Sequence, residues 1–207
     1  MKAQTRIQAE KTETILEAAL EVFSTHGFRG ATIDQIAEAA GLSKPNLLYY
    51  YPSKEAIHRA LLSRLLDTWL APLRDLDANG DPLKEITAYI QRKLEMSRDY
   101  PRESRLFANE IVQGAPRMLD VIKGPLKDLV DEKAAIIRGW SRAGKIARMD
   151  PYHLLFSIWA TTQHYADFDA QIRGILGAEE DGHFHDASRH LSTLFTKALR
   201  PSGITGL

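Results

Sequence analysis

Residues 27–54 read GFRGATIDQIAEAAGLSKPNLLYYYPSK, and this stretch decides how the N-terminal part of the chain folds. Thr32 directly precedes apolar residues at helical spacing, and Gln35 follows three residues later. This pattern is typical of a capping box, in which the two side chains satisfy backbone N–H groups at the start of a helix. Gly41 is the kind of residue at which a helix ends. The sequence therefore predicts a short helix over residues 32–40.

A second short helix is predicted directly after the first. Ser43 can cap it, and Pro45 lies close to its first turn, where proline is tolerated. Pro52 cannot continue a helix, so this second helix covers residues 44–50. Two short helices around a tight turn at 41–43 have the spacing of a helix-turn-helix unit, whose second helix can lie in the major groove of DNA.

The second helix carries side chains that suit contact with DNA. Lys44 can bind a phosphate or guanine, and Asn46 can read a base edge. Tyr49 and Tyr50 can contact phosphates or thymine methyl groups. The alternative is a small helical corner with exposed tyrosines, and the spacing alone leaves both interpretations open.

The remaining sequence also has the pattern of helices. Apolar residues recur at steps of three and four, and Gly or Pro separates the segments. We expect an all-α protein of about nine helices. The first covers about 8–26 and ends at Gly27, and the fourth begins at Ser53 and is kinked or ended by Pro72. The later helices are predicted over residues 83–98, 102–113, 116–143, 151–176 and 181–200.

The composition is that of an ordinary globular protein. The 207 residues are 44% hydrophobic and 26% charged, which is enough apolar material for a core and argues against disorder. Net charge is zero, with a small local basic surplus between residues 41 and 64, so no global field attracts nucleic acid. The lack of cysteine excludes disulfides. The start is too polar for a signal peptide, and residues 151–166 are too short and polar to span a membrane, so we expect a cytoplasmic protein with no membrane partner.

The sequence also resembles a known family. Residues 27–37, 41–47 and 52–56 are similar in order, spacing and residue type to the N-terminal domain of TetR-type transcriptional regulators. Two departures are Leu48, where most members have tyrosine, and Tyr51, where they have phenylalanine. The resemblance implies a ligand-responsive repressor that binds operator DNA as a dimer. Its helix-turn-helix DNA-binding domain would cover residues 8–54, and a ligand-binding and dimerisation domain residues 55–200. The residues expected at the DNA are Thr32, Ser43, Lys44, Pro45, Asn46, Tyr49, Tyr50 and Lys54.

The C-terminal part narrows this resemblance. Residues 47–54, 69–73, 97–101 and 158–168 are similar to a subgroup of TetR-type regulators that control pyrimidine utilisation. The resemblance implies a homodimer whose effector is uracil, with thymine also recognised. Asn109 and Gln113 stand where smaller or apolar residues are expected, so a response to an unrelated small molecule stays open as the alternative.

A uracil site needs a stacking wall and complementary amide groups, because the ring has two carbonyl acceptors and two N–H donors. Gln163 offers a donor and an acceptor in one side chain, and Trp159 lies one turn earlier on the same helix face. Trp69 is a candidate for the opposite wall. The alternative for Gln163 is a buried amide that the backbone satisfies inside a dimer core. The complete set of candidate ligand contacts is Trp69, Leu73, Asn109, Gln113, Trp159 and Gln163.

The predicted helix over 151–176 is apolar on two opposite faces, and such a helix must be buried on both. One face can line the ligand cavity while the other packs against a second copy of the chain. The sequence therefore favours a dimer built largely from its last two long helices.

Metal binding and catalysis are the other classes of function that the residues raise. His183 and His185 could contribute to a zinc or nickel site. A spacing of two, however, places them about 200° apart on a helix, so they cannot share one ion. The other class is a small all-α enzyme acting on a pyrimidine. His164 and Asp167 share a helix face, so a His–Asp pair is geometrically possible. No phosphate loop or nucleophile elbow accompanies them. We therefore expect no metal, no cofactor and no enzyme.

Overall fold

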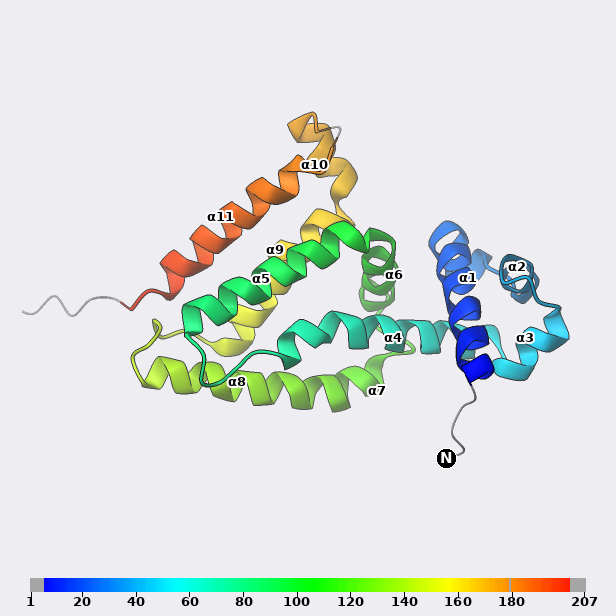
Figure 1. Cartoon of the computed structure of the whole chain (residues 1–207), viewed down its shortest axis with the longest axis horizontal. Helices are drawn as coiled ribbons and strands as arrows, with labels where there is room; N and C mark the ends of the chain where they lie inside the picture. Colours follow the sequence, from blue (N-terminus) through cyan, green and yellow to red (C-terminus); the bar gives the residue numbers. More distant parts are fainter. Residues whose placement is uncertain (1–5, 179, 202–207) are drawn as a thin grey trace, which may run out of the picture. The chain divides into compact units, whose positions relative to one another are not determined.

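The computed structural model describes residues 6–178 and 180–201, and every regular element in this part of the chain is helical (Figure 1). The prediction of an all-α protein is confirmed. The α-helices are α1 (Arg6–Gly30), α2 (Ile33–Ala39), α3 (Lys44–Tyr50), α4 (Lys54–Arg74), α5 (Pro82–Asp99), α6 (Pro101–Val112), α7 (Leu119–Val121), α8 (Lys127–Arg142), α9 (Pro151–Asp167), α10 (Asp169–Leu176) and α11 (Gly182–Leu199). A π-helical segment, η1 (Ile122–Leu126), lies between α7 and α8.

The chain divides into two compact units. One consists of Met1–Thr68 with Arg105–Leu119, and the other of Trp69–Ser104 with Asp120–Leu207. The division falls inside α4, so both units contain part of this helix. The domain boundary between residues 54 and 55 remains a prediction.

The first unit is built around the small helices that the sequence predicts. Gly27 breaks α1 with φ of 65°, as its predicted role at the end of the first helix requires. Gly41, at φ of 62°, makes the turn after α2. Leu47 of α3 and Ile36 of α2 are fully buried and join these helices to the core of the unit.

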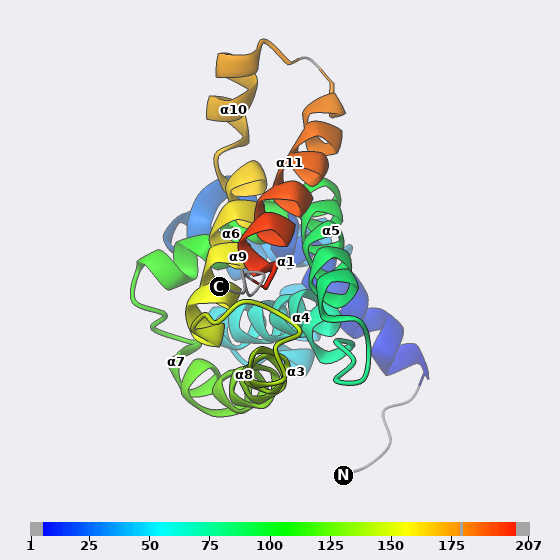
Figure 2. The same ribbon diagram turned by 90° about the vertical axis from the view of Figure 1, so that its left-hand side faces the viewer.

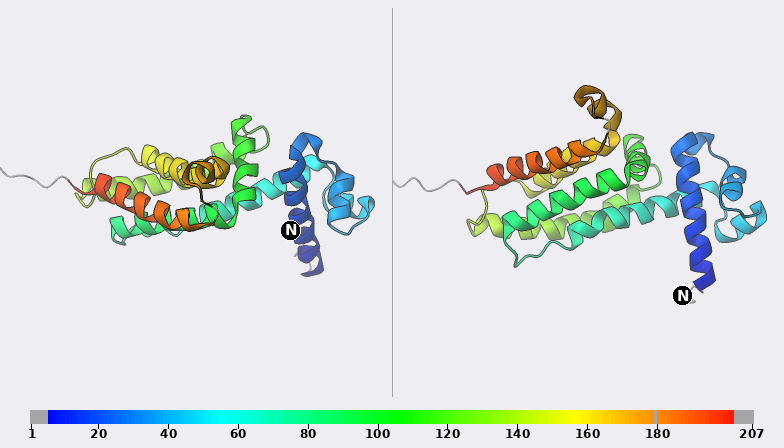
Figure 3. Two further views of the ribbon diagram at one scale, coloured as in Figure 1. Left: turned by 90° about the horizontal axis from the view of Figure 1, so that it is seen from above. Right: turned by 45° about the horizontal axis from the view of Figure 1, so that its top comes forward.

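The second unit is a helical bundle in which α5 packs against both α9 and α11, and α8 packs against α9 (Figures 2 and 3). Its core is formed by apolar residues of these helices and of the end of α4. The most deeply buried include Leu73, Ile86, Ile90, Ala134, Ile137, Leu155 and Ile158.

Pro72 does not end α4, which continues through it to Arg74, so the alternative of a kink stays open. Two helices that were predicted as single are interrupted. The single helix predicted over 116–143 is interrupted at η1, where Gly124 is non-helical and Pro125 has no N–H to donate. The single helix predicted over 151–176 breaks at Phe168, whose backbone leaves the helical region at φ −116° and ψ 28°. At both interruptions the apolar residues keep their helical spacing although the backbone leaves the helical conformation. The spacing alone therefore does not reveal the break.

Candidate DNA interface and effector site

The capping box at the start of α2 is present as predicted. Gln35 N–H donates to Thr32 Oγ1 at 3.2 Å, and Thr32 N–H donates to Gln35 Oε1 at 2.8 Å. Ser43 caps α3 by accepting from Asn46 N–H at 3.4 Å. These caps fix the start of both helices, and with them the direction in which α3 presents its side chains.

The outer face of α3 carries the polar residues predicted to read DNA. Lys44, Asn46 and Tyr49 are exposed, and the Tyr49 side chain is 76% exposed although it is aromatic. Its ring meets that of half-buried Tyr50 edge to face at 5.4 Å. An exposed aromatic pair beside an amide and an ammonium offers stacking, hydrogen-bonding and charged contacts on one short helix.

Lys44 has an ion-pair partner on the neighbouring helix. Its Nζ lies 2.9 Å from Asp34 Oδ2 of α2, and both side chains are at least half exposed. Exposed pairs contribute little to stability, about 0–1 kcal/mol. A phosphate could therefore take the place of Asp34 at little cost to the fold.

Lys54, which the resemblance places at the DNA, makes contacts within its own unit. Its Nζ donates to the carbonyl oxygens of Phe28 and Ala31, both at 2.7 Å, and lies 4.6 Å from the centre of the Phe28 ring. The side chain is half-buried. The ammonium therefore satisfies carbonyls at the end of α1, and its contact with DNA remains a prediction.

The same unit contains a charged cluster that sequence reasoning missed. The Arg117 guanidinium lies 3.6 Å from the centre of the Phe28 ring, on which Lys54 also lies. Glu110, 3% exposed, accepts from Arg117 N–H at 2.7 Å and from its guanidinium at 3.0 Å. His58 is buried between the Phe23 and Phe28 rings. Burial and the nearby Arg117 charge lower the pKa of His58 to about 4, so this imidazole is neutral at neutral pH.

In the second unit, α5 connects the two tryptophans predicted to form the effector site. Trp159 Nε1–H of α9 donates to the Tyr89 hydroxyl at 2.7 Å. One turn along α5, Lys93 Nζ lies 4.2 Å from the centre of the Trp69 ring of α4. Burial raises the pKa of Tyr89 well above its ordinary value, so its hydroxyl keeps its proton.

The predicted ligand residues divide between the two units. Half-buried Gln163 lies one turn after Trp159 on α9, and none of the described residues provides a hydrogen-bond partner for its amide. Leu73 is fully buried one turn after Trp69. Asn109 and Gln113 belong to the first unit and are exposed there. Tyr89 and Lys93 were missed because neither residue belongs to a motif, and only the packing of α5 on α9 and α4 places them here.

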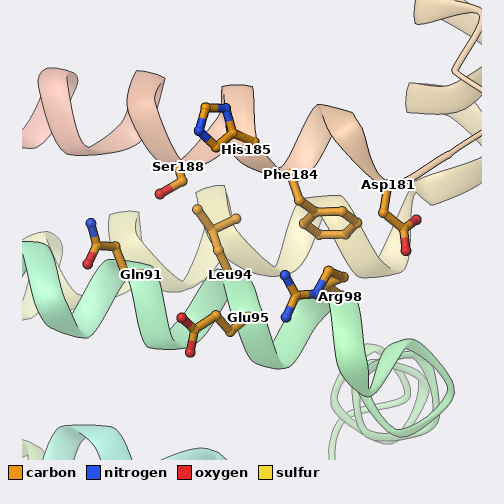
Figure 4. A pocket seen from close by; sticks show the side chains of 8 residues that line it. All are labelled: Gln91, Leu94, Glu95, Arg98, Asp181, Phe184, His185 and Ser188. Atoms are coloured by element: carbon orange, nitrogen blue, oxygen red, sulfur yellow. The ribbon is translucent and has the colours of Figure 1, made fainter.

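A separate surface groove of about 390 Å³ lies between α5 and α11 (Figure 4). Most of the residues that line it are polar, and none of them is a predicted ligand residue. It is formed by Gln91, Leu94, Glu95, Arg98, Asp181, Phe184, His185 and Ser188. Its open, charged surface differs from the enclosed aromatic site that a flat ring needs.

The histidines of α11 face different surroundings. His183 is buried while His185 is exposed. In the described part of the chain, no three His, Asp or Glu side chains gather closely enough to hold a metal ion. No described helix is long and apolar enough to cross a membrane.

The two capped helices and the exposed polar face of α3 define a helix-turn-helix regulator, and comparisons with known proteins specify the family. Residues 15–61 match the family described as bacterial regulatory proteins, tetR family. Residues 62–202 match the C-terminal region of YcdC-like proteins. The chain belongs to the TetR family of transcriptional regulators, and neither its relatives nor its fold are those of an enzyme.

Several relatives extend over almost the whole chain. The HTH-type transcriptional regulator RutR of Escherichia coli K12 is 48% identical over 200 residues, which cover 96% of this chain and 94% of that protein. RutR of Shigella flexneri matches equally well. A TetR-like regulator from Rhodococcus sp. RHA1 has the same fold, with a TM-score of 0.68, 21% identity, and coverage of 91% of this chain and 95% of that one.

Proposed function

We propose that this chain is a dimeric regulator whose binding to operator DNA is controlled by uracil or a related pyrimidine, in the cytoplasm. The observation that carries the proposal is that α5 contacts both tryptophans within one unit: Tyr89 accepts from Trp159, and Lys93, one turn along, lies over the Trp69 ring. Gln163 follows one turn after Trp159 on α9. Two indole rings offer stacking surface, and the Gln163 amide offers a donor and an acceptor for the edge of a pyrimidine. The 48% identity to RutR supports a shared type of regulator.

Gln163 is half-buried, and within one chain its amide has no hydrogen-bond partner among the described residues. Its donor and acceptor are therefore available to a ligand, and the alternative, an amide that the backbone satisfies inside a dimer core, stays open.

A second copy of the chain is proposed to cover the apolar residues that α9, α10 and α11 leave exposed. Phe156 is 48% exposed and Phe168 53%, and Ile175, at 75%, is more exposed still. Large exposed apolar side chains that gather on adjoining helices are typical of an interface. Sedimentation at micromolar concentration checks this, and a monomer would contradict it.

The experiment for the effector uses duplex DNA that the protein itself selects from random sequence. Calorimetry measures the binding of uracil, thymine and cytosine, and gel shifts measure operator binding with and without each base. We expect uracil to bind and to change operator affinity. If uracil fails to bind, the pyrimidine assignment is wrong, and mass spectrometry of a co-purified ligand then tests the alternative of an unrelated effector.

A further inference from the structure

Two lysines are buried in the second unit, and they differ in one respect. Lys133, 5% exposed, donates to the carbonyl oxygen of Arg74 at 2.8 Å and lies 3.0 Å from Glu132 Oε1. Lys93, 3% exposed, has no hydrogen-bond or ion-pair partner among residues 6–178 and 180–201. The surroundings of Lys133 satisfy its ammonium, whereas those of Lys93 provide mainly the face of an indole ring.

Within the described part of the chain, Lys93 contacts the face of Trp69, whose ring centre lies 4.2 Å from Nζ. The face of an indole attracts a cation, but it does not replace the hydrogen bonds that three N–H donors make in water. A buried charge left in this state is costly to the fold. Proteins keep such groups where they serve binding or chemistry.

The register of α5 on α9 places Lys93 beside the predicted ligand residues. Tyr89 of α5 is hydrogen-bonded to Trp159 of α9. One turn further along α5, Lys93 experiences the charge of Asp167, which lies two turns after Trp159. Gln163 is midway between these two points on α9, so its amide lies along the same stretch of α5 as the Lys93 ammonium.

We propose that Lys93 donates a hydrogen bond to an oxygen of the effector, which is a flat, neutral or anionic ring carrying a carbonyl or carboxylate group. This inference rests on the proposed function and specifies the ligand class, because an ammonium repels cationic ligands and favours oxygen acceptors. Tyr89 and Gln163 supply neutral hydrogen bonds, and Lys93 supplies the charged one. Charge-assisted bonds are shorter and roughly twice as strong as neutral ones.

The ionisation of Lys93 is consistent with this role. Burial lowers its pKa to about 7, and the Asp167 charge opposes that shift only in part. At neutral pH the amine therefore exists in both forms, and a bound oxygen acceptor favours the ammonium.

The first experiment compares Lys93→Met with the matched control Lys133→Met, using uracil as the probe. Methionine keeps the length and apolar stem of lysine but removes the charge. We expect Lys93→Met to bind uracil at least tenfold more weakly than wild type and to have an equal or higher Tm, since an unpaired buried charge is removed. Lys133→Met should keep uracil affinity and have a lower Tm, because the carbonyl oxygens of Arg74 and Leu76, which Lys133 Nζ contacts at 2.8 and 3.5 Å, lose their donor.

Outcomes of this comparison separate the two proposals. Wild-type affinity for uracil in Lys93→Met would remove Lys93 from the site and leave the pyrimidine assignment intact. A Tm that falls in Lys93→Met as far as in Lys133→Met would show that Lys93 is a structural residue, and would overturn the inference.

The second experiment does not depend on the ligand being a pyrimidine. Cyanate is small and carbamoylates neutral amines, and mass spectrometry of peptides locates the product. At pH 7 we expect faster modification at Lys93 than at Lys133, and protection of Lys93 by uracil. If wild type binds no uracil, the proposed function fails, whereas fast modification of Lys93 would still support an accessible ammonium site there. Absence of modification at Lys93 would overturn the inference.

Discussion

Replacement of Lys54 by methionine tests which of two roles this residue has. The resemblance to TetR-type regulators places Lys54 at the DNA, where an ammonium binds phosphate, whereas the structure gives the ammonium two carbonyl acceptors, those of Phe28 and Ala31, each at 2.7 Å. An ammonium that satisfies the end of α1 contributes to folding, and an ammonium that binds phosphate contributes to the salt dependence of DNA binding. The two roles therefore predict effects in different measurements.

The magnitude for Lys54→Met follows from the contacts. Ala31 is buried, so in the variant its carbonyl oxygen loses its donor and water does not fully replace it. The half-buried Phe28 also loses the cation that lies on its ring. Hydrogen bonds to charged groups contribute about 1.5–3 kcal/mol each. Since Phe28 is only half-buried, we expect the loss in unfolding free energy to be nearer that of one such bond, about 2–3 kcal/mol. For a unit of this size that corresponds to a fall in Tm of roughly 10 °C.

The assay combines urea unfolding with operator binding over a range of salt concentrations. Lys44→Met is the control, because Lys44 is exposed and pairs with the exposed Asp34. We expect Lys54→Met to lose stability with an unchanged salt slope. Lys44→Met should change stability by less than about 0.5 kcal/mol while its log–log salt slope falls by about one. Unchanged stability in Lys54→Met, together with a slope lower by one, would refute this reasoning and establish the phosphate contact.

Three further predictions concern base reading, the effector and pH. Asn46→Ala should cost about 1–3 kcal/mol of discrimination between operator and random DNA, measured by competition gel shifts, and an unchanged preference removes Asn46 from base reading. Gln163→Leu should weaken uracil binding tenfold or more by calorimetry, with the dimer intact by sedimentation, and equal affinity would exclude Gln163 from the site. His58 has its pKa lowered from 6.5 to about 4, so the unfolded chain binds more protons between these values. Stability should therefore fall by up to about 3 kcal/mol as pH decreases from 6.5 to 4, and His58→Phe should remove this slope.

Features encoded by neighbouring residues were predicted well from the sequence. The caps at Thr32 and Ser43 and the break at Gly27 each depend on residues within one helical turn. Features that depend on distant residues were not. Glu110 contacts Arg117 across the end of α6, and Lys93 meets Trp69 from another helix, so no spacing rule indicates either pair. The breaks at Gly124 and Phe168 were missed because apolar periodicity reports burial rather than backbone angles.

The proposed coupling between effector and operator depends on α4, which extends from Lys54 to Arg74 and belongs to both units. Lys54 at its start binds the end of α1, and the Trp69 ring further along it contacts the Lys93 ammonium. A ligand that takes the Lys93 ammonium away from Trp69 therefore changes a contact of this same helix. Uracil can shift DNA binding only if its affinity differs between the two conformations of the protein.

Linkage makes this coupling measurable from either side. If uracil lowers operator affinity by a given factor, typically 5–150-fold for coupled sites, operator DNA must lower uracil affinity by the same factor. We expect calorimetric titration of uracil into free protein and into the operator complex to give a ratio that equals the one from gel shifts. In Lys93→Met both ratios should approach one together. A ratio that stays at its wild-type value in Lys93→Met would show that the coupling does not pass through the Lys93–Trp69 contact, and the proposed role of α4 would then be wrong.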